Sequence, residues 1–434
     1  MVTDLERHIE ETPLVDTHEH MRREQDWTEQ GPDILQDLFG NYVPADLHTA
    51  GATGEAMHRL MNAADEDIAG RFEGIREAWE AVQFTGYGEA VRLIAERVYG
   101  IQELTGAAIA SKAHRTRELQ KPGERLRILK VDANLDHIQT DDFSWPCPPD
   151  MSGPNFFLYD MSWATFCNGQ VFPDALHKET GVGVVDLASL RQAMEALFEK
   201  HAPCAVAMKA QHAYNRTLLW RERSDSDAEA ALQEVLTKPD NEISVETRLC
   251  LGDWCWQRGV ELSVEHNLPF KIHTGYYAGN DRMPVSRIKS GNMCALLARN
   301  LNAKFVLMHI AYPYSGELIA LAKHYRNVWI DFCWAWSIDP WSSRDTLRRC
   351  VHAVPINKLF AFGGDTAWPT SAYAYSIQAR QELRRALQAE IDEGYMNEKQ
   401  AMGIASRIML QNQRDCFDLD GTRANIAQAV QAAE

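Results

Sequence analysis

A regular alternation of apolar stretches and helical stretches runs from Asp186 to Asp365 and limits the folds open to this chain. Each apolar stretch has the length of a buried strand, and each stretch between them carries hydrophobic residues at helical spacing. Strands that are joined through helices pair in parallel, because such crossovers are right-handed. The sequence therefore predicts an α/β protein with a parallel sheet.

Eight strands are predicted in the whole chain. They begin at Leu14, Arg127, Asn155, Cys204, Phe270, Phe305, Val328 and Leu359. Eight parallel strands fit a closed (β/α)8 TIM barrel better than an open doubly wound sheet, which is the alternative. Barrels of this kind often run long as one domain, so we expect residues 1–434 to form a single domain.

Residues 30–121 interrupt the pattern after the first strand. Two segments there place hydrophobic side chains three and four residues apart, which predicts amphipathic helices at 68–82 and 91–101. We interpret this stretch as a helical insertion that serves both in packing or dimerisation and as a cap over a site. Residues 134–185, rich in proline and glycine, are interpreted as a long loop region.

Potential metal ligands stand at the predicted carboxyl ends of strands, where barrels of this type carry their functional side chains. They are His18, His20, Asp132, Lys209, His273, His309, Asp331 and Asp365. Each alone has an ordinary explanation as a buried histidine, a helix cap or half of an ion pair. Together they favour a metal site, because neutral imidazoles and carboxylates bind divalent first-row ions.

The pair His18 and His20 is the clearest part of this set. Side chains at i and i+2 of a strand share a face, so both imidazoles point to one place. Thr17 and Glu19 then point away from the metal and are expected to be structural. The pair supplies half of a four-ligand site, so the other ligands must come from later strands.

The same residues resemble the amidohydrolase superfamily. The shared pattern is His-x-His on the first strand, histidine on the fifth (Lys271–Gly275) and sixth (Leu307–Ile310), and aspartate on the eighth (Gly363–Asp365). Met208–Arg216 and Ala311–Tyr314 are similar to the amidohydrolase-related branch (amidohydrolase 2), which includes the nodulin-type domain fused to some glutamine synthetases. The insertion after the first strand is similar to that of uronate isomerases.

The resemblance implies a metal-dependent hydrolase whose divalent ion, zinc or else manganese, is bound by His18, His20, His273 and Asp365. Asp365 would also transfer a proton from water to the leaving group, and His309 would polarise a substrate oxygen or bind a second ion. One ion is expected, or two if Lys209 is carboxylated and bridges them. Lys209 could equally be a free ammonium that binds a substrate carboxylate.

Arginine and aromatic residues just beyond the strands are the candidates for substrate binding. They are Arg22, Arg216 and Arg282 for an acidic group, and Tyr276, Trp334, Trp336 and Trp368 for the pocket wall. The expected substrate is a small molecule with an amide, lactone or ester bond, acidic if one of these arginines binds it. The alternatives are a decarboxylase or a uronate-type isomerase on the same barrel, and a non-catalytic binding or assembly protein.

Charge and cysteine usage limit the partners and the compartment. A net charge of -17 argues against nucleic acid and anionic membranes as partners. The nine cysteines form no Cys-x-x-Cys pair, and residues 1–11 lack the apolar core of a secretory signal. We therefore expect a cytoplasmic protein. Its expected partner is a small-molecule substrate, and we also expect it to be a homo-oligomer.

Overall fold

Eight parallel strands pair in sequence order in the computed structural model, which describes residues 3–433. They are β1 (Leu14–Glu19), β2 (Leu135–Thr140), β3 (Phe157–Ser162), β4 (Ala205–Ala210), β5 (Phe270–Ile272), β6 (Phe305–Leu307), β7 (Val328–Asp331) and β8 (Leu359–Phe360). The amides of Thr17 and His20 donate to the carbonyls of Phe362 and Thr366, at 3.0 and 2.8 Å, and so join β1 to the segment after β8. The sheet is a nearly closed barrel, and the predicted (β/α)8 fold is confirmed.

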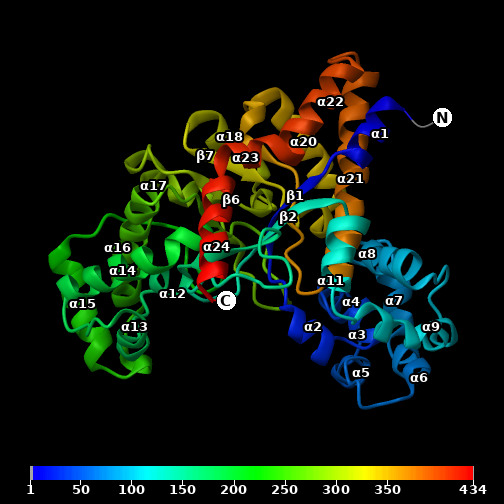
Figure 1. Cartoon of the computed structure of the whole chain (residues 1–434), viewed down its shortest axis with the longest axis horizontal. Coiled ribbons are helices and arrows are strands. Elements are labelled where there is room, and N and C mark those ends of the chain that lie inside the picture. Colours follow the sequence, from blue (N-terminus) through cyan, green and yellow to red (C-terminus); the bar gives the residue numbers. More distant parts are fainter. Residues whose placement is uncertain (1–2, 434) are drawn as a thin grey trace.

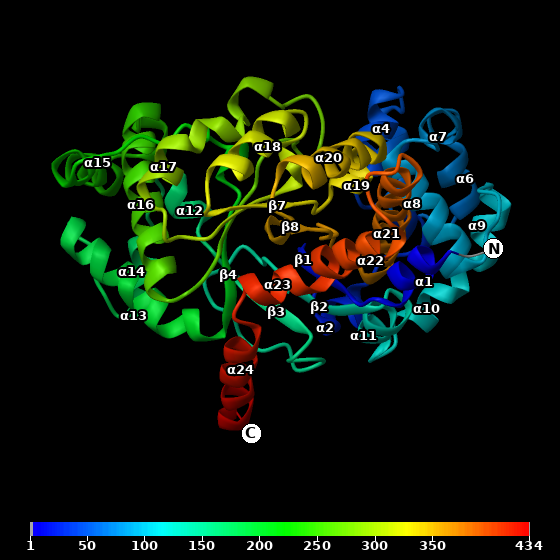
Figure 2. The same cartoon turned by 90° about the horizontal axis from the view of Figure 1, so that it is seen from above.

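Helices surround the barrel in Figures 1 and 2. Those outside the β1–β2 connection are α1 (Asp4–Glu11), α12 (Ala164–Cys167), α13 (Pro173–Thr180), α14 (Leu187–His201), α15 (Asp225–Thr237), α16 (Val245–Glu265), α17 (Cys294–Arg299), α18 (Ser315–His324), α19 (Ala335–Ile338), α20 (Pro340–Ala353), α21 (Pro369–Asp392), α22 (Glu398–Ser406), α23 (Asn412–Cys416) and α24 (Leu419–Ala433). Helix α24 projects from the rest of the molecule in Figure 2. Within residues 3–433, no helix has the length and hydrophobicity to cross a membrane.

The connection between β1 and β2 is helical, and its blue and cyan helices gather on one side of the barrel in Figure 1. Its elements are α2 (Glu24–Gln30), α3 (Ile34–Phe39), α4 (Val43–Thr49), α5 (Gly54–Leu60), α6 (Ile68–Glu73), α7 (Arg76–Val82), α8 (Gly86–Ile94), η1 (Ala95–Tyr99), α9 (Gly106–Lys112), η2 (Ala113–Arg115), α10 (Thr116–Leu119), α11 (Glu124–Arg127) and η3 (Ile128–Asp132). The predicted helix at 68–82 is two helices, α6 and α7, with a break at Gly74 and Ile75.

The second strand lies later than the sequence predicted. Residues 127–132 are helical, and β2 begins only at Leu135. Ile128 and Leu129 are buried whereas Val131 is 66% exposed, a pattern of one buried helical face rather than of strand alternation. Asp132 therefore does not end a strand, and its carboxylate instead binds Arg127 at 2.8 Å on the surface.

Charged residues of the strands lie inside the barrel and are mostly paired. The ammonium group of Lys271 on β5 donates to both carboxylate oxygens of Asp160 on β3, at 2.8 Å, and to the carbonyl of Thr17 on β1. All of these groups are fully buried. A buried charge is tolerated only when it is paired, so this contact holds three strands together beneath their carboxyl ends.

Candidate metal centre

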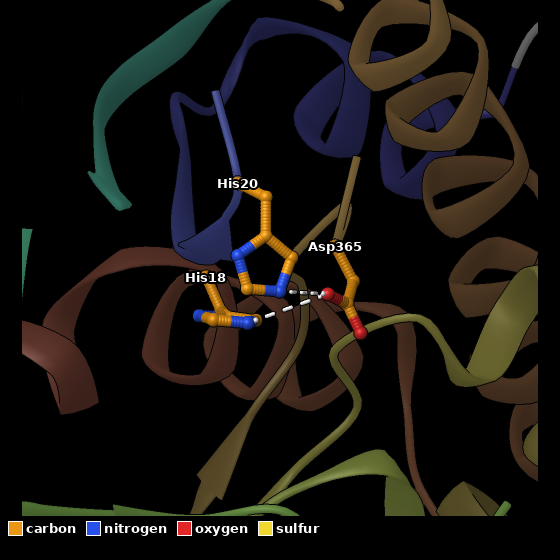
Figure 3. Close-up of side chains that lie close together, drawn as sticks. All are labelled: His18, His20 and Asp365. Carbon is orange, nitrogen blue, oxygen red and sulfur yellow. Dashed lines mark ion pairs between the residues drawn. The ribbon is translucent and has the colours of Figure 1, made fainter. Parts of the chain in front are cut away.

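Three side chains, two from the end of β1 and one from the segment after β8, meet at the carboxyl ends of the barrel strands. Nε2 of His18 and Nε2 of His20 each lie 3.3 Å from Oδ1 of Asp365, and Figure 3 shows both rings next to that oxygen. The second carboxylate oxygen, Oδ2, lies 3.7 Å from Nε2 of His309. Asp365 therefore stands between the β1 histidines and the histidine that follows β6.

The protonation states of these groups suit a divalent cation. Burial lowers the pKa of His18 and of His273 well below the usual range, and that of His309 to about 4, so the three imidazoles are neutral at pH 7. Burial alone would raise the pKa of Asp365, but the neighbouring imidazoles, His18 first, outweigh it and hold that pKa well below its usual range. Neutral imidazoles beside an ionised carboxylate are a zinc-binding donor set.

Histidines 273 and 309 face each other through nitrogens that carry no hydrogen. His309 uses its Nδ1 hydrogen to donate to the carbonyl of Cys333 at 3.0 Å, and His273 uses its Nε2 hydrogen to donate to the carbonyl of Tyr276 at 2.9 Å. Nε2 of His309 and Nδ1 of His273 then lie 2.9 Å apart, and each directs a lone pair at the other. Within the described part of the chain, both ring nitrogens of His18 also lack a hydrogen-bond partner although the residue is fully buried. These observations fit a bound cation.

The ring of His20 is oriented by the segment that follows β2. Its Nδ1 donates to the carbonyl of Asp141 at 2.7 Å, which directs Nε2 toward Asp365. The ring of Phe143 stacks on it, with 4.5 Å between ring centroids and 8° between planes. Phe143 has a φ of 62° and is 63% exposed, so it occupies a left-handed conformation at the solvent side of the histidine.

Lys209 carries a fully buried amine at the end of β4. Its Nζ lies 3.1 Å from Sδ of Met308, and among residues 3–433 it forms no ion pair. Burial lowers the pKa of this amine, while the charge of Asp365 acts in the opposite direction. Lys209 thus differs from Lys271, which is paired with Asp160.

The three candidate arginines lie in different surroundings. Arg216 is buried, and its guanidinium donates to Asp253 at 2.5 Å and to the carbonyl of Cys167 at 3.0 Å, so it is already committed to internal contacts. Arg22 is exposed. Arg282 is also exposed and lines a pocket of about 180 Å³ together with Tyr276.

The candidate aromatic residues also lie in different surroundings. Trp334 is buried, and its ring lies 5.4 Å from that of His309. Its indole nitrogen has no hydrogen-bond partner among the residues that the structure describes. Tyr276 lies 6.0 Å from Trp334 and so borders both the histidines and the pocket. Trp336 instead donates to the carbonyl of Ala361 at 2.7 Å, and Trp368 packs on a tryptophan of α2.

Residues 17 and 19 of β1 form supporting contacts, as their direction on the strand predicts. The hydroxyl of Thr17 donates to Asp331 at 2.7 Å, and a carboxylate oxygen of Glu19 accepts a hydrogen bond from the amide of Thr366. Burial raises the pKa of Asp331 to about 7. These contacts join β1 to β7 and to the segment that carries Asp365.

Sequence reasoning missed three residues of this region. Tyr42, at the start of α4, donates its hydroxyl to the carbonyl of Asp365, and its ring lies 4.4 Å from that of Trp334. The helical insertion therefore forms part of the wall of the centre. The other two are Phe143 and Cys333. Cys333 lies two residues beyond the carboxyl end of β7, the kind of position at which the predicted ligands stand.

Comparisons with known proteins agree with this picture. Residues 204–397 match the amidohydrolase family model. Protein fluG of Emericella nidulans is 25% identical over 231 residues, which are 50% of this chain and 26% of fluG, so the match spans about a quarter of that relative's length.

Two solved structures share the fold over nearly the whole chain. Uronate isomerase of Thermotoga maritima has a TM-score of 0.79 at 14% identity, covering 95% of this chain and 96% of that one. Glucuronate isomerase of Caulobacter crescentus has a TM-score of 0.78 at 16% identity, covering 96% and 93%. The expected resemblance is confirmed: residues 204–397 match the amidohydrolase family model, and nearly the whole chain shares its (β/α)8 fold with the two isomerases.

Proposed function

We propose that this protein is a metal-dependent hydrolase of a small molecule with an amide, lactone or ester bond. The observation that carries the proposal is the position of Asp365, an ionised carboxylate with one oxygen 3.3 Å from His18 and His20 and the other 3.7 Å from His309. A carboxylate at this place can both bind a cation and transfer a proton.

His18, His20, His273 and Asp365 would hold the divalent ion, with zinc as the first choice because the set is rich in imidazole. When bound, such an ion polarises a carbonyl group and lowers the pKa of water. The facing lone pairs of His273 and His309 support a cation at this place, because without one they would repel each other at 2.9 Å.

Side chains of the protein would carry out proton transfer, substrate orientation and substrate binding. Asp365 accepts the proton of the attacking water and returns it to the leaving group, while His309 orients the substrate oxygen. The unpaired amine of Lys209 binds a substrate carboxylate or, once carboxylated, a second ion. Arg282 and Tyr276 bind the distal part of the substrate, because they line a pocket of about 180 Å³ that shares Tyr276 with the centre.

A uronate-type isomerase is the second candidate. Its support is the extent of the likeness to the Thermotoga maritima uronate isomerase, 95% of this chain at a TM-score of 0.79. In an isomerase Asp365 would transfer a proton between neighbouring substrate carbons instead of between water and a leaving group. An exposed cation such as Arg282 suits the carboxylate of a uronate equally well.

A substrate panel with a metal measurement tests the proposal. The purified protein is assayed on lactones, amides and esters beside uronates and other carboxylic acids, before and after chelation and after zinc is restored. We expect hydrolysis that chelation abolishes and zinc restores. Aldose to ketose conversion without hydrolysis would establish the isomerase instead, and carbon dioxide release would establish a decarboxylase. A protein with no tight metal and no turnover would be a binding protein.

A further inference from the structure

A buried thiol stands beside the proposed centre and has no assigned role. Cys333 follows β7, and it is fully buried. Its Sγ, a nitrogen of His309 and a carboxylate oxygen of Asp365 all lie within 4.8 Å of one another. From this arrangement we propose that Cys333 is a metal ligand, and that Cys333, His309 and Asp365 form a second cation position next to that of His18 and His20. The proposal rests on the proposed metal-dependent function.

The backbone around Cys333 holds the sulfur in this place. The amide of Cys333 donates to Asp331 at 2.9 Å, and its carbonyl accepts the Nδ1 hydrogen of His309 at 3.0 Å. A Cβ on Gly363 would lie 2.8 Å from Sγ, so glycine at this position leaves the space that the sulfur occupies. Among residues 3–433 the thiol makes a single hydrogen-bond contact, a long approach of 4.0 Å to the carbonyl of His18, which leaves the sulfur available to a ligand.

Two further observations point to a cation on this side of Asp365. The carboxylate divides its oxygens between two groups of imidazoles, with Oδ1 toward His18 and His20 and Oδ2 toward His309, as a carboxylate bridging two ions does. In addition, Nε2 of His309 carries no hydrogen, because the hydrogen of this neutral ring lies on Nδ1. The lone pair of Nε2 is thus available beside Oδ2.

The thiol would bind the ion as a thiolate. On binding, the S–H bond of Cys333 breaks, a sulfur–metal bond forms, and the proton leaves to solvent. A position with sulfur, imidazole and carboxylate ligands selects zinc or cobalt over magnesium, manganese and calcium, which prefer oxygen. The sulfur would therefore make the second position more selective than the first.

Cobalt titration of the full-length protein after chelation tests this inference. We expect two equivalents of Co²⁺ to bind, the second with the near-ultraviolet absorption band of a cobalt–thiolate bond. Cys333→Ser should bind one equivalent and show no such band, whereas Cys350→Ser, which changes a buried cysteine on α20, should behave as the wild type. Circular dichroism checks that both variants are folded. If Cys333→Ser does not fold, the thiolate band of the wild-type protein still tests the inference.

Three results would overturn the inference. One is saturation of the wild type at a single equivalent, and another is a second equivalent without the thiolate band; both leave the proposed hydrolase with its first ion. The third is a protein that binds no cobalt at all, which would also remove the metal-dependent function. The first equivalent therefore tests the proposed function, and the second tests the role of Cys333.

Discussion

Gly364 passes so close to Glu19 that a Cβ at the glycine would lie 2.1 Å from Oε1 of the glutamate. Glu19 also accepts a hydrogen bond from the amide of Thr366. The residues on both sides of Asp365 are thus in contact with β1, and this contact sets how near Asp365 comes to His18 and His20. Glycine at 364 is required by space rather than by backbone conformation.

Gly364→Ala should therefore destabilise the protein and weaken metal binding together. We expect a loss of about 1–3 kcal/mol in the free energy of unfolding, because the new methyl group displaces a buried carboxylate. Glu19→Ala should remove the clash, so the double variant should lose less than the sum of the two single variants. Urea unfolding of the four proteins measures the coupling, and strict additivity would contradict the contact.

Asp365→Asn should keep the fold and lose most of the turnover. The amide has the shape of the carboxylate but cannot accept the proton, and general acid–base catalysis of this kind contributes about 10²–10⁴-fold. The measurement is kcat on the substrate found in the panel, with circular dichroism for the fold. Asp420→Asn on the surface is the control, and turnover near that of the control would refute the proton-transfer role of Asp365.

His18→Ala should lose the tightly bound ion. His18 is fully buried, and within residues 3–433 neither of its ring nitrogens has a hydrogen-bond partner. Its removal takes away a ligand and leaves His20 as the remaining β1 histidine beside Oδ1 of Asp365. Elemental analysis after dialysis should find less than half of the wild-type metal content. His177→Ala on the exposed face of α13 should retain it, and equal metal in both variants would exclude His18 as a ligand.

The sequence predicts well those parts of the fold whose hydrophobic pattern fits only one type of secondary structure. Val328–Asp331 is an apolar run between two amphipathic helices, and it forms β7 with those bounds. The pattern of residues 127–132 fits two types of element. Ile128 and Leu129 can be buried equally well in a short strand or on one face of a helix. Packing against the rest of the chain decided for the helix, and no local signal distinguishes the two.

The same limit applies to the site. Parallel strands place their carboxyl ends together, so His18, His20, His309 and Asp365 could be predicted to meet from topology alone. Tyr42 could not, since its contact with Asp365 depends on how the helical insertion docks on the barrel. The partner of Arg216 is Asp253 on α16, and sequence offers no rule that pairs those two positions.

A buried carboxyl group far from the metal ligands in sequence should make the stability depend on pH. Asp37 on α3 accepts hydrogen bonds from the hydroxyls of Tyr99, at 2.6 Å, and Thr370, at 2.5 Å, and so ties the helical insertion to α21. Burial raises the pKa of Asp37 to about 6 from an ordinary value of 3.8, although the two hydroxyls act to lower it. The folded state therefore binds the proton more tightly than the unfolded state.

The contribution of Asp37 to the free energy of unfolding is then fully present below about pH 4 and is lost as the pH rises through about 6, a change of about 3 kcal/mol. Asp331 and Asp160 titrate in an overlapping range, with pKa values raised by burial to about 7 and about 6, so the wild-type curve alone does not isolate Asp37. Subtracting the curve of Asp37→Asn does, because those groups are common to both proteins. Urea unfolding in the presence of chelator from pH 4 to 7 should show the wild type losing stability relative to the variant. A difference that is constant over this range would show that Asp37 does not titrate there.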